Sequence, residues 1–305
     1  MKTRDIFFGV DAKLRSGWRF SVFVIFYGLI SFFLSLVSAP FLFSLAMDES
    51  MPRYLPFAVG GFFGLAPAIL IGWLCGKLLE GLPFRALGVW FTGGWLKHLI
   101  IGSLIGALTL GIAVAIGVVF GNLDFSFNSA ETSAITQTLL SSLLVFGVAA
   151  AFEEALFRGY ILQTFARSGL AWLAIILTSV FFGAVHLGNP NAGLLSTLNT
   201  ALAGVWFGVA YLKTRDLWFV WGLHLMWNWT QGAIFGIEVS GLTEIVHSPL
   251  LKESDHGPAW LTGENYGIEA SIACTIALIV STIVIYFMPL LKPSEEMRKL
   301  SEPGA

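Results

Sequence analysis

Residues 137–166 read QTLLSSLLVFGVAAAFEEALFRGYILQTFA, a run long enough to cross a bilayer but interrupted by charge near its middle. About 20 mostly apolar residues span the hydrocarbon core of a membrane. Ionisable side chains are costly there, so Glu153, Glu154 and Arg158 are expected to face a bundle interior and to mark a functional site. The stretch therefore predicts an α-helical membrane protein with chemistry inside the bilayer.

The composition of the whole chain agrees with this interpretation. Of its 305 residues, 56% are hydrophobic and 12% are charged, and the mean hydropathy is +0.79. Soluble domains carry about 25% charged residues. The net charge of −2 comes without a basic block, which argues against nucleic acid as a partner. Cys75 and Cys274 lie in separate apolar runs and predict neither a disulfide framework nor a paired metal site.

Eight segments of the chain are approximately long and apolar enough to be spans. They are 20–46, 55–79, 96–120, 137–166, 170–188, 192–213, 216–237 and 267–291. The first exceeds the apolar region of about 7–15 residues in a cleaved signal peptide, so it is expected to remain as a span. The sequence thus predicts one domain over 1–305, an all-α polytopic membrane helix bundle of about eight transmembrane helices.

Cationic residues predict how the bundle is oriented. They gather before the first span, at the second, fourth and sixth connections, and after the last span, whereas the opposite side has Arg53 and Lys252. The positive-inside rule therefore predicts that both termini are cytoplasmic. The long acidic connection 238–266 is expected outside.

The charged motif in the fourth span holds two carboxylates with different expected roles. Glu154 and Arg158 are four residues apart, share one helical face and can form an ion pair. Glu153 points about 100° away on the same turn, given 3.6 residues per turn. One carboxylate is thereby free to face a cavity. The alternative is a structural ion pair at the end of a helix.

Two later spans each carry histidine. His186 ends the motif Phe182-Gly-Ala-Val-His186, and His224 begins His224-Leu-Met-Trp-Asn228. His224 and Asn228 are four apart, so they line one helical stripe. A single intramembrane histidine is often a hydrogen-bonded helix contact, and it is the combination with Glu153 that favours a functional site.

Helix geometry indicates where this site lies. At a rise of about 1.5 Å per residue, Glu153 and His186 lie at similar distances from the turn at Ser168-Gly169. The site is therefore expected in the cytoplasmic half of the bilayer. This leaves the breaker cluster 188–191 closer to the membrane than a simple loop would be.

Several other catalytic schemes find little support in the sequence. It contains neither a His-Glu-x-x-His helix nor a Gly-x-Ser-x-Gly elbow. No aspartate lies in the interior of a predicted span, since Asp216 is at a turn, and this excludes an intramembrane aspartate dyad. A serine–histidine pair stays open, although no serine has a distinguishing context.

The ordered motifs Glu-Glu-x-x-x-Arg, Phe-x-x-x-His and His-x-x-x-Asn resemble those of the CPBP family. This family includes the type II CAAX prenyl endopeptidases and Abi-type membrane proteins. All three motifs match, at Glu153–Arg158, Phe182–His186 and His224–Asn228, and the resemblance covers about 137–235. It implies an intramembrane endopeptidase, with 137–235 as its catalytic core, in a bacterial cell membrane.

The resemblance also implies roles for the motif residues. Glu153 and His186 would activate water, while His224 and Asn228 would stabilise the oxyanion. Glu154, Arg158 and Phe182 would support the site, and the two glutamates could exchange roles. The substrate would be a membrane-associated, prenylated or small peptide.

The family's metalloprotease label adds a second possibility for the same residues. Glu153, His186 and His224 could bind Zn²⁺ and leave a fourth position for water. A metal-free site is favoured slightly, because Asn228 is a poor zinc ligand but a good hydrogen-bond donor.

Two non-enzymatic functions compete with the peptidase. Buried acids and histidines also form proton relays in transporters, and a binding or immunity protein would need no catalysis. Transporters often show inverted repeats, and no such repeat is evident here. A binding homologue would be expected to lack a motif residue, whereas all are present.

Overall fold

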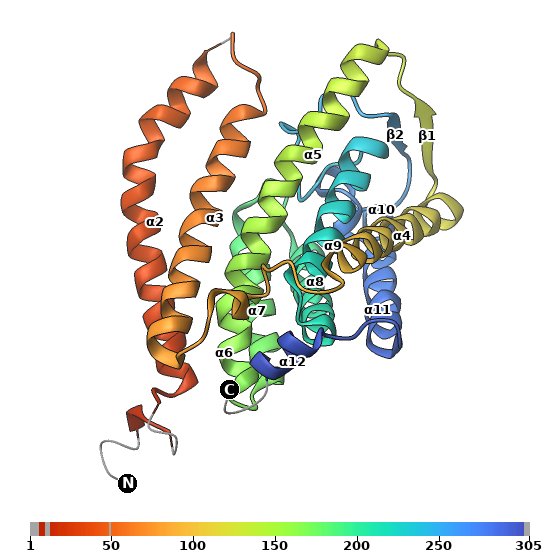
Figure 1. Cartoon of the computed structure of the whole chain (residues 1–305). Coiled ribbons are helices and arrows are strands. Elements are labelled where there is room, and N and C mark those ends of the chain that lie inside the picture. Colours follow the sequence, from red (N-terminus) through yellow and green to blue (C-terminus); the bar gives the residue numbers. More distant parts are fainter. Residues whose placement is uncertain (1–5, 10–12, 49, 302–305) are drawn as a thin grey trace.

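The computed structural model describes residues 6–9, 13–48 and 50–301, and in them the chain is an all-α membrane bundle (Figure 1). The longer helices are α2 (Ser16–Met47), α3 (Leu55–Cys75), α4 (Trp95–Gly121), α5 (Thr132–Glu154), α7 (Ala171–Val185), α8 (Leu194–Thr214), α9 (Leu217–Trp229) and α11 (Ile272–Phe287). The shorter elements are α6 (Leu162–Arg167), α10 (Ala259–Thr262), α12 (Glu295–Ser301) and the strands β1 (Leu123–Phe127) and β2 (Leu251–Asp255).

Single turns of other helix types continue or link these helices. The π-helical turns η1 (Gly76–Glu80), η3 (Ala155–Ile161) and η5 (Thr230–Ile234) extend α3, α5 and α9. The 3₁₀ turns are η2 (Phe84–Leu87), η4 (His186–Gly188), η6 (Glu264–Tyr266) and η7 (Ile268–Ala270). Because η3 leads from α5 into α6, one continuous helix carries the whole predicted fourth span.

Helices occur at all eight predicted spans, but not all are long enough to cross a bilayer unaided. Within the described ranges, six are: Ser16–Met47, Leu55–Glu80, Trp95–Gly121, Thr132–Arg167, Ala171–Gly188 and Leu194–Thr214. Of the other two, α11 has 16 residues, and the helix made of α9 and η5 covers 217–234 but carries the polar residues His224, Asn228 and Gln231. The predicted number of eight crossings is therefore approximate, because the chain leaves α9 and enters α11 by irregular segments.

The α2–α3 pair stands at one side of the bundle (Figure 1). Of the described residues of α2, only Ser16, Arg19, Phe23 and Ser38 are buried, while large apolar side chains such as Phe33 and Val37 are exposed. Such a surface suits hydrocarbon rather than water. α2 is thus a lipid-facing helix anchored mainly at the end that carries Arg19.

A buried ion cluster provides that anchor. Glu80 accepts hydrogen bonds from Arg19 Nη1 and Arg167 Nη2, each at 2.6 Å, and from Thr164 Oγ1 at 2.9 Å. These partners come from α2 and α6, whereas Glu80 ends the π turn after α3. Buried charges are tolerated when they are paired and hydrogen-bonded, so the cluster ties three helices together at the end nearest the termini.

The closest helix crossing in the bundle joins α4 to α9. A Cβ atom added to Gly102 would overlap the carbonyl oxygen of Phe219, and one added to Gly106 would overlap that of Leu223. Small residues allow backbones in membranes to approach in this way. The start of α9 is also fixed to α4, because His98 Nδ1 bonds Asp216 Oδ2 at 2.8 Å while Oδ1 accepts from Trp218 N at 2.9 Å.

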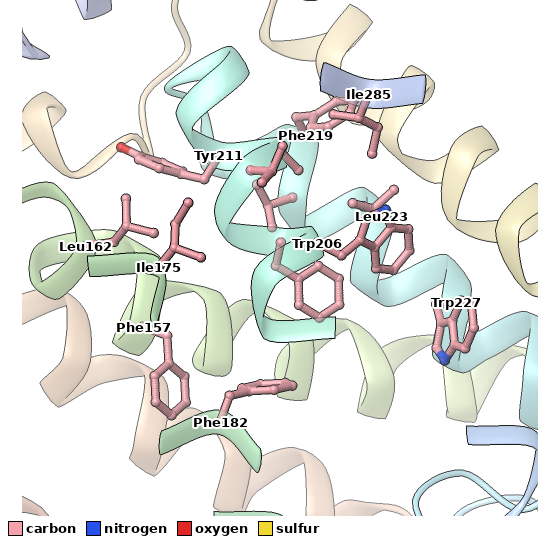
Figure 2. Close-up of a cluster of buried hydrophobic side chains, with 14 of the residues drawn as sticks. Phe157, Leu162, Ile175, Phe182, Trp206, Tyr211, Phe219, Leu223, Trp227 and Ile285 are labelled. Carbon is pink, nitrogen blue, oxygen red and sulfur yellow. The ribbon is translucent and has the colours of Figure 1, made fainter. Parts of the chain in front are cut away.

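An apolar core fills the space between α5, α7, α8, α9 and α11 (Figure 2). Trp206 lies at its centre, fully buried, and its indole N–H donates to Ser281 Oγ at 3.0 Å. Phe157 and Phe182 face each other at one side of the cluster, with ring centroids 5.4 Å apart, and Trp227 lies at the other side. The core therefore reaches the helices that carry all three motifs.

The long connection between α9 and α11 is structured rather than free. Its strand β2 pairs antiparallel with β1, from Leu123 opposite Asp255 to Phe127 opposite Leu251. This two-stranded sheet lies at the end of the bundle opposite both termini (Figure 1). The sequence predicted no strands, because the two partners are each five residues long and far apart in the chain.

Replacing Gly106 by alanine tests the α4–α9 crossing. The added methyl group would overlap the Leu223 carbonyl, so we expect a destabilisation of about 1–3 kcal/mol, typical of overpacking. The measurement is the thermal unfolding midpoint in detergent. Gly111→Ala is the matched control on the same helix, because nothing lies within 4 Å of the position its Cβ would take. Equal midpoints for the two variants would contradict the close approach.

Candidate active site

Four residues from three separate helical segments line one cavity of ≈ 350 Å³. They are Glu153 near the end of α5, His186 at the start of η4, and His224 and Asn228 on α9. Phe182 of α7 also lines it. The cavity volume lies at the lower end of the range of about 300–1,000 Å³ found for small-molecule sites. The three motifs, spread over 76 residues of sequence, therefore meet at one place.

The two glutamates of the first motif face different surroundings. The Glu153 side chain is 24% exposed and lines the cavity, and its Oε2 atom has no hydrogen-bond partner in the described part of the chain. Glu154 is 1% exposed and lies instead against a second, apolar cavity between α3, α5 and α9. This divergence follows from the 100° rotation between consecutive helical residues.

Glu154 is the centre of a buried polar network. Its Oε1 atom accepts from Arg158 Nη1 at 3.1 Å and from His224 Nδ1 at 2.9 Å. Arg158 Nη2 donates to the Gly204 carbonyl at 3.1 Å. The network links α5, η3, α8 and α9, so the ion pair suggested by the i,i+4 spacing also orients the His224 ring.

Aromatic rings enclose this network. The Arg158 guanidinium carbon lies 4.9 Å from the Phe182 ring centroid and 5.0 Å from that of Phe207. The Phe207 ring stacks on His224, with centroids 4.5 Å apart and planes at 23°. Cation–π contacts of this kind stabilise a desolvated cation. The aromatic residues thus hold Arg158 and His224 in place and exclude water from them.

His186 is fixed by its own helix. Its Nδ1 atom lies 2.7 Å from the Phe182 carbonyl oxygen, which can only accept, so Nδ1 carries the proton and donates. The neutral ring then keeps a lone pair on Nε2. Phe182 packs beside it, with ring centroids 4.8 Å apart. His186 can therefore accept a hydrogen bond or a proton through Nε2.

The residues do not form the ligand set of a metal ion. Over the described ranges, no group of three or more histidine, cysteine, aspartate or glutamate side chains is arranged to bind one. Glu153 Oε2 and His224 Nε2 are 3.9 Å apart, and the hydrogen bonds of the two histidines use Nδ1 and leave both Nε2 atoms free. The expected zinc set of Glu153, His186 and His224 is thus not assembled as a group in the described part of the chain.

The structure adds residues to the site that the motif analysis did not identify. Glu269 of η7, Ser240 and Asn199 line the same cavity, as does Phe207. Glu269 lies within the predicted span 267–291, so the rule that flagged Glu153 could have flagged it too. Ser240, Asn199 and Phe207 carry no comparable signal in the sequence.

The connection after α9 closes the cavity from the end opposite the termini. Asn189 Nδ2 donates to the Ser240 carbonyl at 3.1 Å, and Asn191 Nδ2 donates to the Asn265 carbonyl at 3.2 Å. The breaker cluster 188–191 thus ends α7 below that face of the bundle, and the connection folds inward to meet it. Residues Gly188, Pro190 and Asn191 themselves stay exposed, so the cluster is held by these two side-chain hydrogen bonds rather than by burial.

Known proteins share the segment that contains the three motifs. Residues 135–230 match the family described as type II CAAX prenyl endopeptidase Rce1-like. A protein of Escherichia coli, described as an uncharacterized 24.3 kDa protein, is 31% identical over 145 residues. That match covers 47% of this chain and 63% of the relative, so the chain spans less than two thirds of the relative's length.

The family match confirms the resemblance that the motifs predicted, and it supports an intramembrane peptidase. The matched range 135–230 contains Glu153, His186, His224 and Asn228. This segment of the chain is therefore similar to the Rce1-like family of type II CAAX prenyl endopeptidases.

Proposed function

We propose that this protein is an intramembrane endopeptidase that hydrolyses a peptide bond of a membrane-associated or prenylated peptide. The observation that carries the proposal is the convergence of Glu153, His186, His224 and Asn228 on one cavity. Two groups in it can accept a proton from water, and two can donate to an oxyanion. Hydrolysis of an amide needs both functions.

Glu153 and His186 are the proposed pair that activates water. Glu153 Oε2 has no partner among the described residues, and His186 Nε2 carries the free lone pair of the ring. The water oxygen attacks the carbonyl carbon of the substrate while its proton passes to Glu153. The same proton then passes to the amide nitrogen, and the carbon–nitrogen bond breaks to release an acid and an amine.

His224 and Asn228 are proposed to stabilise the tetrahedral oxyanion. When the His224 ring carries both protons, Nδ1 donates to Glu154 and Nε2 is left to donate into the cavity. Asn228 offers the amide N–H₂ group from the next turn of α9. Donors fixed in advance, where water is scarce, stabilise developing charge strongly. Glu154 and Arg158 therefore orient this part of the site rather than react.

We propose that the reaction is metal-free, because Asn228 is a poor zinc ligand but a good hydrogen-bond donor. Among the described residues no three-ligand group is assembled around the cavity. A proton-relay transporter and a binding or immunity protein remain the rival functions. Neither accounts for a proton acceptor and two oxyanion donors around one peptide-sized cavity.

We also propose that both termini are cytoplasmic. α12 and the start of α2 lie at one end of the bundle, and β1 and β2 lie at the other (Figure 1). The lysine and arginine residues concentrate at the first end, which favours the cytoplasmic side. The connection that covers the cavity would then be external.

Glu153→Gln tests the proposed base. We expect turnover to fall by about 10²–10⁴-fold, because general base catalysis typically contributes that much. The assay uses purified protein in detergent with quenched fluorescent peptides of about 20 apolar residues, the length of a span. Glu131→Gln is the control, since Glu131 is exposed at the N-cap of the same helix. Equal cleavage by wild type and Glu153→Gln, or cleavage by neither across the panel, would favour a non-enzymatic function.

Metal analysis tests the metal-free mechanism. Protein purified without chelator should contain far less than one zinc ion per chain, and treatment with a strong chelator should leave its peptidase activity unchanged. The measurements are elemental analysis and the same fluorescent assay. Stoichiometric zinc whose removal abolishes activity, and whose return restores it, would overturn this part of the proposal.

Cysteine labelling in intact cells tests the orientation. Ser254 and Lys299 are exposed residues on β2 and α12, whereas the native Cys75 and Cys274 are buried and give little background. An impermeant maleimide should label Ser254→Cys from outside and should label Lys299→Cys only after lysis. The reverse pattern would place the termini outside.

A further inference from the structure

The charge on the wall of the site cavity is unbalanced. Its acidic side chains are Glu153 and Glu269, and His186 and His224 accompany them; among the described residues no lysine or arginine lines it. Arg158 lies behind the wall and is engaged by Glu154 and the Gly204 carbonyl. The group stays negative even if His224 is protonated and His186 is neutral. It then contains two cations, Arg158 and His224, and three carboxylates, which are those of Glu153, Glu154 and Glu269.

Glu269 is not one of the motif residues, and its position is well defined. Its Oε2 atom accepts from the Ser240 backbone N–H at 2.5 Å and from Ser240 Oγ at 3.0 Å. Its Oε1 atom accepts from the Trp227 indole N–H at 3.3 Å. Asn199 Nδ2 donates to the Glu269 carbonyl oxygen at 2.8 Å. The carboxylate is therefore held in one place by three neutral donors, and no lysine or arginine is among these contacts. The basic side chain that interacts with it electrostatically is His186, which lines the same cavity.

The contacts of Glu269 also place it within the site. Trp227 directly precedes Asn228 on α9, so Glu269 lies beside the wall that carries the proposed oxyanion donors. Glu153 approaches from α5. Glu269 is partly exposed, and it lines the cavity rather than lying beneath its surface. A substrate in the cavity would thus meet two carboxylates, Glu153, which is proposed to act on water, and Glu269, which is not.

Electrostatics then favours one class of occupant. A carboxylate in a poorly hydrated cavity is costly unless a cation lies near it. Opposite charges attract strongly at short range where the effective dielectric constant is low, and like charges repel equally. A cationic group on the substrate would offset Glu269, whereas an anionic group would face two carboxylates. Neutral donors such as Ser240 and Trp227 hold the geometry without cancelling the charge.

We propose that the cavity selects peptides with a cationic group, a lysine or arginine side chain or an amine, close to the bond to be cleaved. Glu269 binds this group, while Ser240 and Trp227 position the Glu269 carboxylate. The inference rests on the proposed peptidase function and names its substrate class. It also disfavours substrates whose free C-terminal carboxylate would have to enter the cavity.

Equilibrium binding tests the selection separately from catalysis. The protein carries Asn228→Ala, which keeps Glu153 and Glu269 but slows turnover. The probes are fluorescein-labelled peptides of about 20 apolar residues, identical except for lysine, norleucine or glutamate at one position scanned along the chain. For at least one position we expect the lysine peptide to bind about 10-fold more tightly than the norleucine peptide, and the glutamate peptide to bind more weakly still. The readout is fluorescence anisotropy in detergent.

Three variants then assign the selection to Glu269. Glu269→Gln should reduce the lysine preference to about 3-fold or less, since one close charge pair is lost. Glu269→Asp should keep most of the preference because the charge remains. Glu264→Gln, an exposed residue of the same connection outside the cavity, should leave it unchanged. Retention of the full preference in Glu269→Gln would overturn the role of Glu269.

The Asn228→Ala protein, which retains Glu269, keeps the test decisive even if Glu269→Gln does not fold. Equal binding of the lysine and norleucine peptides at every position, or binding of none of them, would overturn the proposed selection. Cleavage without charge preference would leave the peptidase standing and remove only this inference. Charge-selective binding without any cleavage in the wild type would instead identify a binding protein.

Discussion

A single carboxylate oxygen, Glu154 Oε1, joins the elements on which the site depends. It accepts from Arg158 and from His224, and Arg158 reaches on to the Gly204 carbonyl. An arginine and a glutamate inside a membrane bundle are tolerated when they are paired and hydrogen-bonded. That unit ties α5 to α8 and α9. The hydrogen bonds that stabilise these charges in hydrocarbon therefore also fix the ring of His224. Glu153 takes no part in them and faces the cavity.

The position of α9 is fixed from the other side by α4. The crossing is so close that side chains at Gly102 and Gly106 would meet the backbone of α9, and the buried His98–Asp216 contact caps its first turn. The helix made of α9 and η5 ends at Ile234, and the connection that follows turns back toward the bundle. Ser240 of this connection thereby reaches the cavity.

The sequence predicted the fold class and the residues that gather at the cavity, because both follow from local pattern. The length of the apolar segments predicts the spans, and ionisable residues inside those segments indicate the site. It did not predict the burial of Arg19 and Arg167. Both were interpreted as cytoplasmic flanking charges, and the structure pairs them with Glu80 through contacts between distant segments. Glu269 was overlooked for a different reason, since its hydrogen bonds to Trp227 and Ser240 depend on how the last connection folds.

Departures from regular α-helix occur at all three motifs, and at the second motif the 3₁₀ turn η4 begins at His186 itself. The π turn η3 begins one residue after Glu154, and η5 begins two residues after Asn228. A π turn holds an extra residue, so it shifts the face presented by the helix beyond it. The helix from α5 to α6 can thus direct Glu153 into the cavity and then bury Arg158 and Phe157 in the core. Periodicity analysis assumes 3.6 residues per turn throughout and cannot anticipate such a shift.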